Sequence, residues 1–190
     1  SKKHGWRHIL WVHDKRDLPH TMQKLEGKNI EVHEIGDFEG SFSHIQIVLR
    51  EINDKKFGKA SDVFRYMVLK KMGGIYKDTD YRLMQSCNVL TRLYDFFVGV
   101  EPMSNFIGNA FIATKPNHPV VSGVLDLVVR NYDKHKSPKY ISAIPDNDGF
   151  KTILLTGPSA LTTAVYKFAG RPGNTDIIFP PKFLYPTKID

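Results

Sequence analysis

Two aspartates one residue apart, Asp78 and Asp80, are the side chains of this chain whose type and spacing best suit chemistry. They follow residues 74–76, a short apolar segment that is typical of a β-strand. Alternation along a strand would place both carboxylates on one side, with Thr79 opposite. Carboxylate oxygens are the ligands that Mg²⁺ and Mn²⁺ prefer, and such ions commonly hold phosphates. The pair therefore predicts a site for a divalent cation and a phosphate.

An Asp-x-Asp pattern alone is weak evidence, because so short a motif recurs by chance. The chain holds a second one, Asp146-Asn147-Asp148, between Pro145 and Gly149. Asp and Asn are favoured in turns because their side chains bond nearby backbone groups. We interpret this second pattern as loop chemistry. The pair at 78–80 differs because a helix, a glycine stop and a strand precede it in order.

The helix before the acidic pair carries Asp62 and Arg65, which are neighbours on one face at i and i+3. We expect this helix to run from Ser61, as its N-cap, to Met72, with Gly73 in the left-handed position that ends it. Two interpretations stay open for the pair. It is an ordinary helical pair near a favourable helix dipole, or Arg65 binds sugar hydroxyls or phosphate while Asp62 accepts from hydroxyls.

Strand and helix signals alternate along the chain. Predicted strands cover residues 8–13, 29–35, 74–76, 95–100, 109–114 and 177–179. Predicted helices cover residues 17–25, 42–57, 61–72, 117–135 and 156–168, and residues 136–149 form a polar loop. This order predicts an α/β sandwich with a mostly parallel sheet. Ligands bind such sheets beyond the carboxyl ends of the strands, where we expect Asp78 and Asp80.

The composition is that of a globular protein, with 41% hydrophobic and 25% charged residues among 190. No apolar run approaches the roughly 20 residues that span a bilayer. A formal net charge of +7 indicates anionic partners. The basic residues are scattered and not interleaved with aromatics, which argues against nucleic acid. A nucleoside diphosphate or an acidic membrane surface would fit the charge equally well. Cys87 is the only cysteine, so an internal disulfide and a Cys-rich metal site are excluded.

Residues 60–80 resemble the core signature of the sugar-binding DXD glycosyltransferases, glycosyltransferase family 32 and its relatives. The group includes fungal mannosyltransferases, bacterial polysaccharide glycosyltransferases and the clostridial glucosylating toxins. The matching residues are Ala60, Ser61, Asp62, Arg65, Tyr66, Gly73, Gly74, Tyr76, Asp78 and Asp80. Residues 109–119 and 156–158 resemble later family segments, and Trp11 and Asp14 resemble an early strand end. The resemblance covers about residues 6–186.

The resemblance implies a GT-A fold, a Rossmann-like α/β/α sandwich. It implies that Asp80 is a direct ligand of Mn²⁺ or Mg²⁺ and that Asp78 assists the metal and contacts ribose or sugar hydroxyls. Asp78, Asp80 and Arg65 would be the catalytic residues. The remaining donor-binding residues implied are Asp62 and Arg65 for the sugar, Tyr76 for the nucleotide pocket and Asn109 for a further sugar contact.

The implied reaction is metal-dependent transfer of a hexose, with retention at the anomeric carbon, from a UDP- or GDP-sugar to a hydroxyl of a glycan, lipid or protein. A catalytically degenerate domain that binds a nucleotide or glycan is the alternative, and a basic nucleic-acid-binding domain is a third reading that leaves residues 60–80 unexplained. The base, the sugar and the acceptor cannot be read from the sequence.

Relative to the family, the chain begins after the usual first strand and ends before the His or Asn and the Trp that complete the site. We therefore expect one domain over residues 1–190 that lacks these segments. The absence of Asn-x-Ser/Thr sequons and disulfides favours the bacterial cytoplasm or a translocated effector. A Golgi enzyme from which a membrane anchor was removed is the alternative.

Overall fold

The computed structural model describes residues 5–133, 135 and 147–185. The chain divides into two compact units, residues 1–40 and 41–190, and each is described by itself. The expectation of a single domain over residues 1–190 stays a prediction. Within the described ranges, no helix is long and apolar enough to cross a membrane.

The first unit is a parallel strand pair with a helical crossover. Strands β1 (Ile9–Val12) and β2 (Glu31–Glu34) pair in parallel, with Ile9 opposite Glu31. Parallel neighbours need a crossover connection, which the 3-10 helix η1 (Lys15–Asp17) and helix α1 (Pro19–Leu25) supply. A second 3-10 helix, η2 (Ile35–Asp37), follows β2. The two strands that the sequence predicts in this unit are confirmed, each shortened at its ends.

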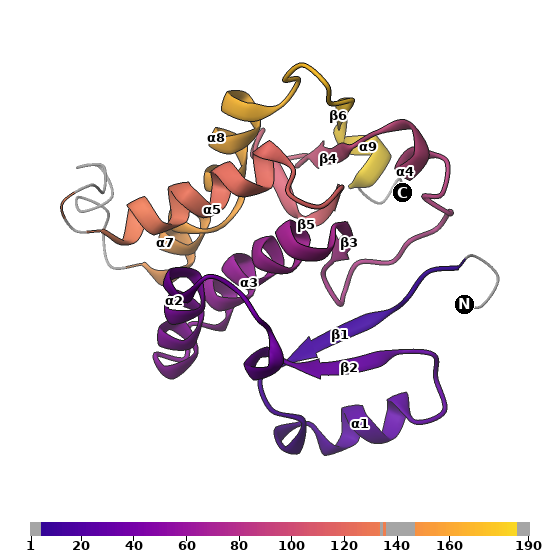
Figure 1. Ribbon diagram of the computed structural model, residues 1–190, viewed down its shortest axis with the longest axis vertical. Helices are drawn as coiled ribbons and strands as arrows, with labels where there is room; N and C mark the ends of the chain where they lie inside the picture. The colour runs from indigo at the N-terminus through magenta and orange to yellow at the C-terminus, as the bar shows by residue number, and fades with distance from the viewer. Residues whose placement is uncertain (1–4, 134, 136–146, 186–190) are drawn as a thin grey trace. The chain divides into compact units, whose positions relative to one another are not determined.

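The second unit holds a four-stranded sheet and most of the helices (Figure 1). Its helices are α2 (Phe42–Asn53), α3 (Phe57–Met72), α4 (Leu90–Leu93), α5 (Pro119–Tyr132), α7 (Asp148–Leu155), α8 (Pro158–Phe168) and α9 (Pro181–Leu184). Its strands are β3 (Gly74–Lys77), β4 (Phe96–Val100), β5 (Ile107–Thr114) and β6 (Asp176–Phe179), in the spatial order β3-β5-β4-β6.

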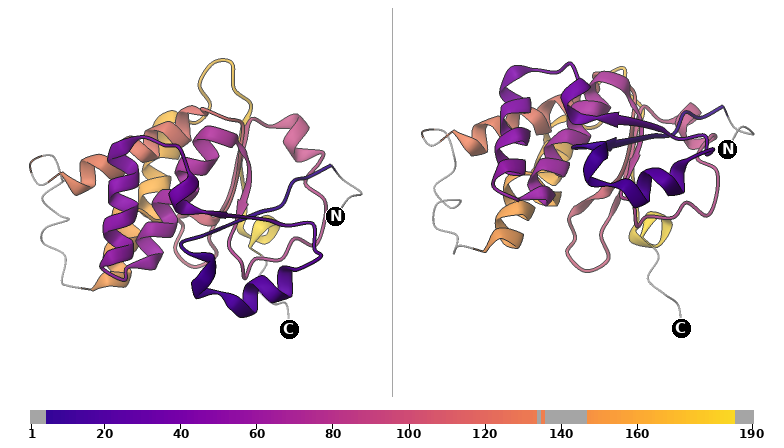
Figure 2. Two further views of the ribbon diagram at one scale, coloured as in Figure 1. Left: turned by 60° about the horizontal axis from the view of Figure 1, so that its bottom comes forward. Right: turned by 90° about the horizontal axis from the view of Figure 1, so that it is seen from below.

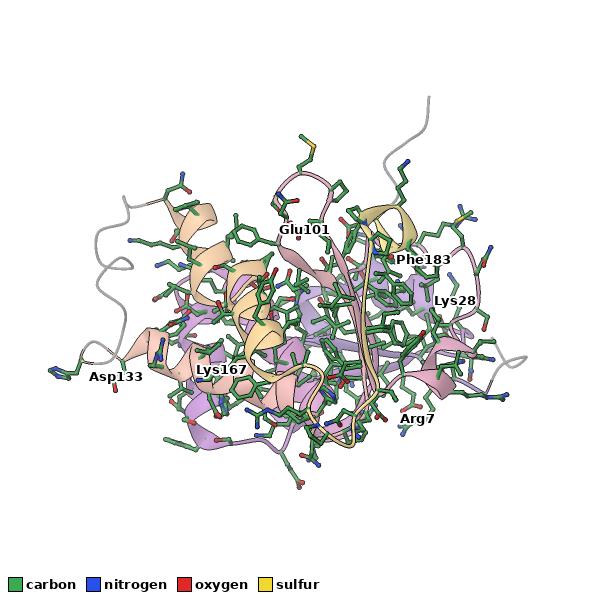
Figure 3. The ribbon with its side chains drawn as sticks, turned by 90° about the horizontal axis from the view of Figure 1, so that it is seen from above. Arg7, Lys28, Glu101, Asp133, Lys167 and Phe183 are labelled. Carbon is green, nitrogen blue, oxygen red and sulfur yellow. The ribbon has the colours of Figure 1, made fainter. Side chains whose placement is uncertain are left out.

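The expectation of a mostly parallel sheet is wrong for this unit. Strand β5 pairs antiparallel with both β3 and β4, and only β4 and β6 are parallel. The connection between β4 and β5 explains part of the difference. It spans only residues 101–106, and the N–H of Glu101 donates to the carbonyl of Phe106 at 2.8 Å. So short a connection joins antiparallel strands and cannot make a crossover. Figure 3 labels Glu101 where this hairpin begins.

Helices α3 and α8 pack on one face of the sheet, and the short helix α9 packs on the other, as Figure 2 shows. Alternation along the strands sends Phe97 and Phe111 to the α9 side, where they form an apolar cluster with Leu184. On the helical side, Val98 and Ile112 are fully buried. The α/β sandwich predicted from the sequence is confirmed as a fold class, with a sheet of mixed direction.

Several predicted helix boundaries differ from the structure. Helix α3 begins at Phe57, so Ser61 lies inside the helix and is not its N-cap. Helix α5 begins at Pro119 with His118 as the N-cap, one residue after Asn117, which the sequence predicts as the cap. Helix α7 was not predicted at all; the polar loop was expected to extend to residue 149. Of that loop, residues 136–146 lie outside the described residues, and the Asn147 side chain caps α7 by accepting from the N–H of Phe150.

Two predictions for the end of α3 are confirmed: the helix stops at Gly73, and a strand follows it. Gly73 ends the helix with φ +64° and ψ −156°, a positive-φ conformation that glycine adopts without strain, although not the left-handed helical one. Its backbone also passes close to Pro116, because a Cβ at Gly73 would lie 2.6 Å from the Cδ of that proline. Strand β3 follows at once, so the glycine turn sets how α3 leads into the sheet.

A buried histidine ties α5 to the sheet. His118 is fully buried and stacks on Phe96, with ring centroids 5.0 Å apart. Its Nδ1 accepts from the N–H of Val120 at 3.3 Å, so the proton of the neutral ring lies on Nε2 and is donated to Asp176 Oδ1 at 3.0 Å. Burial lowers the pKa of His118 below its ordinary value of 6.5, against the opposing attraction of Asp176.

This geometry predicts a pH-dependent contribution to stability. The folded pKa of His118 lies below the unfolded one, so the contribution is complete above about pH 6.5 and decreases as the pH falls through and below that value. His118→Asn keeps a capping side chain and removes the titrating ring. We expect it to cost about 1–3 kcal/mol of unfolding free energy at neutral pH.

Urea unfolding of the wild type and of His118→Asn across a pH series checks this prediction. The difference between the two unfolding free energies should shrink as the pH falls below about 6.5. Asp176, Lys115 and Asp95 act electrostatically on the ring, and they are present in both proteins. A difference that stays constant with pH would contradict the assignment to His118.

Candidate functional site

The site is organised around the guanidinium of Arg65, which is buried on α3 with 6% of its surface exposed. Its Nη2 lies 2.9 Å from Asp62 Oδ1, and its Nη1 lies 3.2 Å from Asp78 Oδ1. Nη1 also donates to the carbonyl of Asn109 at 2.6 Å. One cation therefore joins a helix, the end of strand β3 and strand β5.

The rest of the guanidinium also contacts protein. Nε donates to the carbonyl of Ser61 at 3.3 Å and Nη2 to the Ser61 hydroxyl at 3.2 Å. The plane of the group covers the Tyr76 ring, 4.4 Å from the ring centroid. Burial alone would lower the pKa of Arg65, but attraction to Asp62, Tyr76, Tyr66 and Asp78 raises it above its ordinary value. Arg65 is thus a fixed positive charge held by the protein.

Asp62 is a buried carboxylate, 5% exposed, that receives hydrogen bonds on both oxygens. Asn109 Nδ2 donates to Oδ1 at 2.9 Å, and the Thr156 hydroxyl donates to Oδ2 at 2.9 Å. Burial raises the pKa of Asp62, whereas Arg65, Thr156 and Asn109 act in the opposite direction. Its anionic form therefore depends on the donors that surround it.

Strand β5 sets the spacing between Asp62 and Asp78 through two consecutive residues, Asn109 and Ala110. At Asn109, the carbonyl accepts from Arg65 while the side-chain amide donates to Asp62. At Ala110, the carbonyl accepts from the N–H of Asp78 at 2.8 Å. The same amide of Asn109 lies 3.4 Å from the hydroxyl of the fully buried Tyr66. Hydrogen bonds to two consecutive residues of one strand thus fix the helix acid Asp62 and the strand-end acid Asp78 relative to each other.

The acidic pair lies in a turn, and the expectation that strand alternation orients it is wrong. Strand β3 ends at Lys77, and the N–H of Tyr81 donates to the carbonyl of Asp78 at 3.0 Å, which closes a β-turn over residues 78–81. The Tyr81 hydroxyl bonds the carbonyl of Leu184, so the turn is tied to the end of α9. The turn, and not the pleat of a strand, determines the relative direction of Asp78 and Asp80.

The two aspartates of the turn differ in exposure. The Tyr76 hydroxyl donates to Asp78 Oδ1 at 2.7 Å, and Arg65 reaches the same oxygen, while 34% of the Asp78 side chain is exposed. Burial raises the pKa of Tyr76 to about 12, so its hydroxyl keeps the proton that it donates. Asp80 is exposed. One acid is held in place and the other faces solvent.

The structure thus brings together Asp62, Arg65, Tyr76, Asp78 and Asn109, with Asp80 two residues further along the turn. In the part of the chain that the structure describes, no three His, Cys, Asp or Glu side chains cluster as a metal site would require. Asp148, of the second Asp-x-Asp pattern, contacts Lys59 at 3.1 Å at the start of α7, and Asp146 lies outside the described residues.

Sequence reasoning missed Thr156 as part of this site. It is fully buried at the end of α7 and lies 94 residues from its partner Asp62. Residues 156–158 were noted only for their resemblance to a helix start. A buried threonine next to a glycine and a proline carried no sign of which side chain it would contact.

Comparison with known proteins identifies the family to which the chain is similar. Residues 1–97 match the family described as "Glycosyltransferase sugar-binding region containing DXD motif". A protein named "Toxin" from Photorhabdus asymbiotica is 32% identical over 139 residues, which is 68% of this chain and 4% of the toxin. The chain therefore spans only a small part of that relative.

Two solved structures share the fold of the chain. The PaToxG glycosyltransferase has a TM-score of 0.59 and 22% identity, covering 84% of this chain and 55% of that one. The UDP-bound glycosyltransferase domain of the YGT toxin has a TM-score of 0.59 and 13% identity, covering 86% of this chain and 55% of that one. They bear out the GT-A fold expected from the sequence, and the family match extends over half of the chain. The protein belongs to the DXD-containing, sugar-binding glycosyltransferases.

Proposed function

We propose that the chain transfers a hexose from a uridine diphosphate sugar to a hydroxyl acceptor, with a divalent cation and with retention at the anomeric carbon. The observation that carries the proposal is the Arg65 guanidinium, which holds Asp62 and Asp78 in one frame beside the turn that carries Asp80. A UDP-bound structure of a protein with the same fold supports a uridine nucleotide, and a GDP-sugar is the competing donor.

The chemistry of the acidic turn fits a Mg²⁺ or Mn²⁺ ion that the substrate also ligates. The contacts that Tyr76 and Arg65 make with the Asp78 carboxylate both use Oδ1, and the side chain is partly exposed, while Asp80 faces solvent. Small hard cations are commonly bound through one or two carboxylates together with substrate phosphates and water. When bound, the cation would neutralise charge on the diphosphate leaving group. We assign Asp80 as its direct ligand and Asp78 as the assisting one.

The other residues of the site would bind the donor. Among the described residues, Thr156 is the one hydrogen-bond donor to Oδ2 of Asp62, and we assign the remaining capacity of this oxygen to a sugar hydroxyl. Asn109 is a further sugar contact, and Tyr76 would line the nucleotide pocket. We revise the part expected of Arg65: its five N–H groups already face protein acceptors and the Tyr76 ring, so it would act by placing Asp62 and Asp78.

Retention without a covalent intermediate suits these side chains. No carboxylate of the site is nominated as a nucleophile, since Asp62 is buried among donors and the turn acids are assigned to the metal. In a same-face mechanism the leaving phosphate accepts the proton of the incoming hydroxyl while the glycosidic bond breaks. The acceptor class, whether glycan, lipid or protein, is not specified by these residues. A domain that binds the donor without turnover is the alternative.

The first test is donor binding. Differential scanning fluorimetry of the wild type with a UDP-sugar and Mn²⁺ should show stabilisation that needs both. At a ligand concentration 100 times Kd, the stabilisation is about 2.7 kcal/mol, or roughly 5–10 °C for a chain of this size. Asp80→Asn should lose the metal-dependent part. Asp126→Asn, at an exposed position on α5, is the matched control and should keep it.

Two results would overturn the proposal. One is the absence of a thermal shift with every UDP- and GDP-sugar in the presence of metal. The other is an Asp80→Asn variant that responds as the wild type does.

The second test is stereochemical. Incubated with Mn²⁺ and a UDP-α-hexose in the absence of an acceptor, the protein should slowly release the sugar to water, with the α-anomer appearing first in proton NMR. Retention follows from attack on the face that the leaving group vacates. A β-anomer as the first product would exclude the same-face mechanism. Binding without any release of sugar would favour the binding-domain alternative.

The third test addresses Arg65. Arg65→Lys keeps the charge but cannot reach the two carboxylates and the Asn109 carbonyl with a planar fork. We expect a loss of about 3–5 kcal/mol in unfolding free energy and a fall of roughly 100-fold in kcat/KM for donor hydrolysis, because the acids lose their relative placement. Arg82→Lys, at an exposed position beside the turn, should change neither. Wild-type stability in Arg65→Lys would refute the assignment.

A further inference from the structure

The hydroxyl of Thr156 has two acceptors and one proton. Its Oγ1 lies 2.9 Å from Asp62 Oδ2 and 3.2 Å from the carbonyl oxygen of Thr152, one turn earlier on α7. A hydroxyl carries a single hydrogen, and a bond to an ionised acceptor is shorter and stronger than one to a neutral acceptor. The charged and nearer oxygen of Asp62 therefore receives the proton. Thr156 is fully buried, so water does not compete for it.

The contact determines how the Asp62 carboxylate is rotated. Oδ1 already accepts from Arg65 and Asn109, both on the sheet side of α3. Without Thr156, those two donors would fix one oxygen and leave the other free to swing about it. With Thr156, both oxygens are fixed, and Oδ2 keeps the capacity to accept one more hydrogen bond.

The segment that carries Thr156 is attached to α3 at two points. At the start of α7, Asp148 Oδ1 lies 3.1 Å from the Nζ of Lys59, a side chain that is 4% exposed. At the end of α7, Thr156 reaches Asp62. Because Lys59 and Asp62 are three residues apart on α3, they are neighbours on one helix face. The position of the Thr156 hydroxyl is therefore set by a helix held at both ends.

The next residue leaves room at the same oxygen. A Cβ built on Gly157 would lie 3.3 Å from Asp62 Oδ2 and 3.0 Å from the carbonyl of Thr152. Any side chain here would crowd the carboxylate oxygen that Thr156 orients. The Thr-Gly pair thus supplies a donor to Oδ2 and keeps the surrounding space open.

We infer that Thr156 is a positioning residue for the donor sugar: through its hydrogen bond to Oδ2, it orients the Asp62 carboxylate to accept from a sugar hydroxyl. The inference rests on the proposed function of the site. It assigns Thr156 to the hexose part of the donor and not to the nucleoside diphosphate, because Asp62 is the residue of the described site that its hydroxyl contacts.

The experiment compares how tightly one variant, Thr156→Val, binds a UDP-hexose and UDP. Thr156→Val is close in shape and lacks the hydroxyl. Isothermal titration calorimetry in the presence of Mn²⁺ should show that it binds the UDP-hexose roughly 10-fold more weakly than the wild type, and binds UDP with unchanged affinity. Thr156→Ser keeps the donor and should restore most of the binding of the UDP-hexose. Thr163→Val, which removes an exposed helical hydroxyl on α8, is the matched control and should behave as the wild type.

The outcomes separate the two proposals. If the wild type binds neither ligand with metal present, the proposed function fails and this inference falls with it. If the wild type binds the UDP-hexose and Thr156→Val binds it equally well, only the inference on Thr156 is overturned. Equal weakening of UDP and of the UDP-hexose would overturn it as well, because a general structural role predicts that result. Thr156→Ala removes the same donor without adding a methyl group beside the carboxylate, and it provides the same comparison should the valine variant not fold.

Discussion

The buried guanidinium of Arg65 is the interaction on which the site depends. A buried charge is costly unless opposite charges and hydrogen bonds compensate it, and here they come from three separate segments. Asp62 belongs to the same helix, Asn109 to strand β5, and Asp78 to the end of strand β3. Displacing any one of these partners would leave the cation under-compensated in a low-dielectric environment. Folding of the sheet against α3 and assembly of the acidic site are therefore the same event.

The antiparallel pairing of β5 makes this arrangement possible. Because β5 runs opposite to β3, residues 111–114 of β5 pair with β3, and the first half of β5 extends past the end of β3, with Lys77 opposite Phe111. Asn109 and Ala110 thus fall next to the strand end that carries Asp78. In a parallel pairing, the beginning of β5 would lie beside the beginning of β3, at the opposite end of the strands from Asp78. The mixed sheet is a requirement of the site as well as a feature of the fold.

Local sequence predicted the order of elements but not the contacts between distant ones. Gly73 was recognised as a helix stop because its effect is local: a glycine with positive φ after an apolar helix. Ser61 was misplaced as an N-cap because serine favours that position, yet packing of α3 extends the helix back to Phe57 and turns the Ser61 hydroxyl towards Arg65. The partnership of Thr156 with Asp62 joins residues 94 apart, and nothing within either segment specifies the other.

The charge balance of the site explains why Asp80 is exposed while Asp78 is partly buried. Arg65 lies within contact of two carboxylates, Asp62 and Asp78, and can compensate only one of them in formal charge. With Asp80 added, the group of four side chains has a formal net charge of −2. Such an excess is tolerated because Asp80 and part of Asp78 remain in water, where the self-energy of a charge is low. The same excess would repel a bare diphosphate and would repel it less if a divalent cation were bound to it. In the proposed reaction, this arrangement of a buried, compensated pair and an exposed, uncompensated acid would favour a metal-bound donor over a free nucleotide.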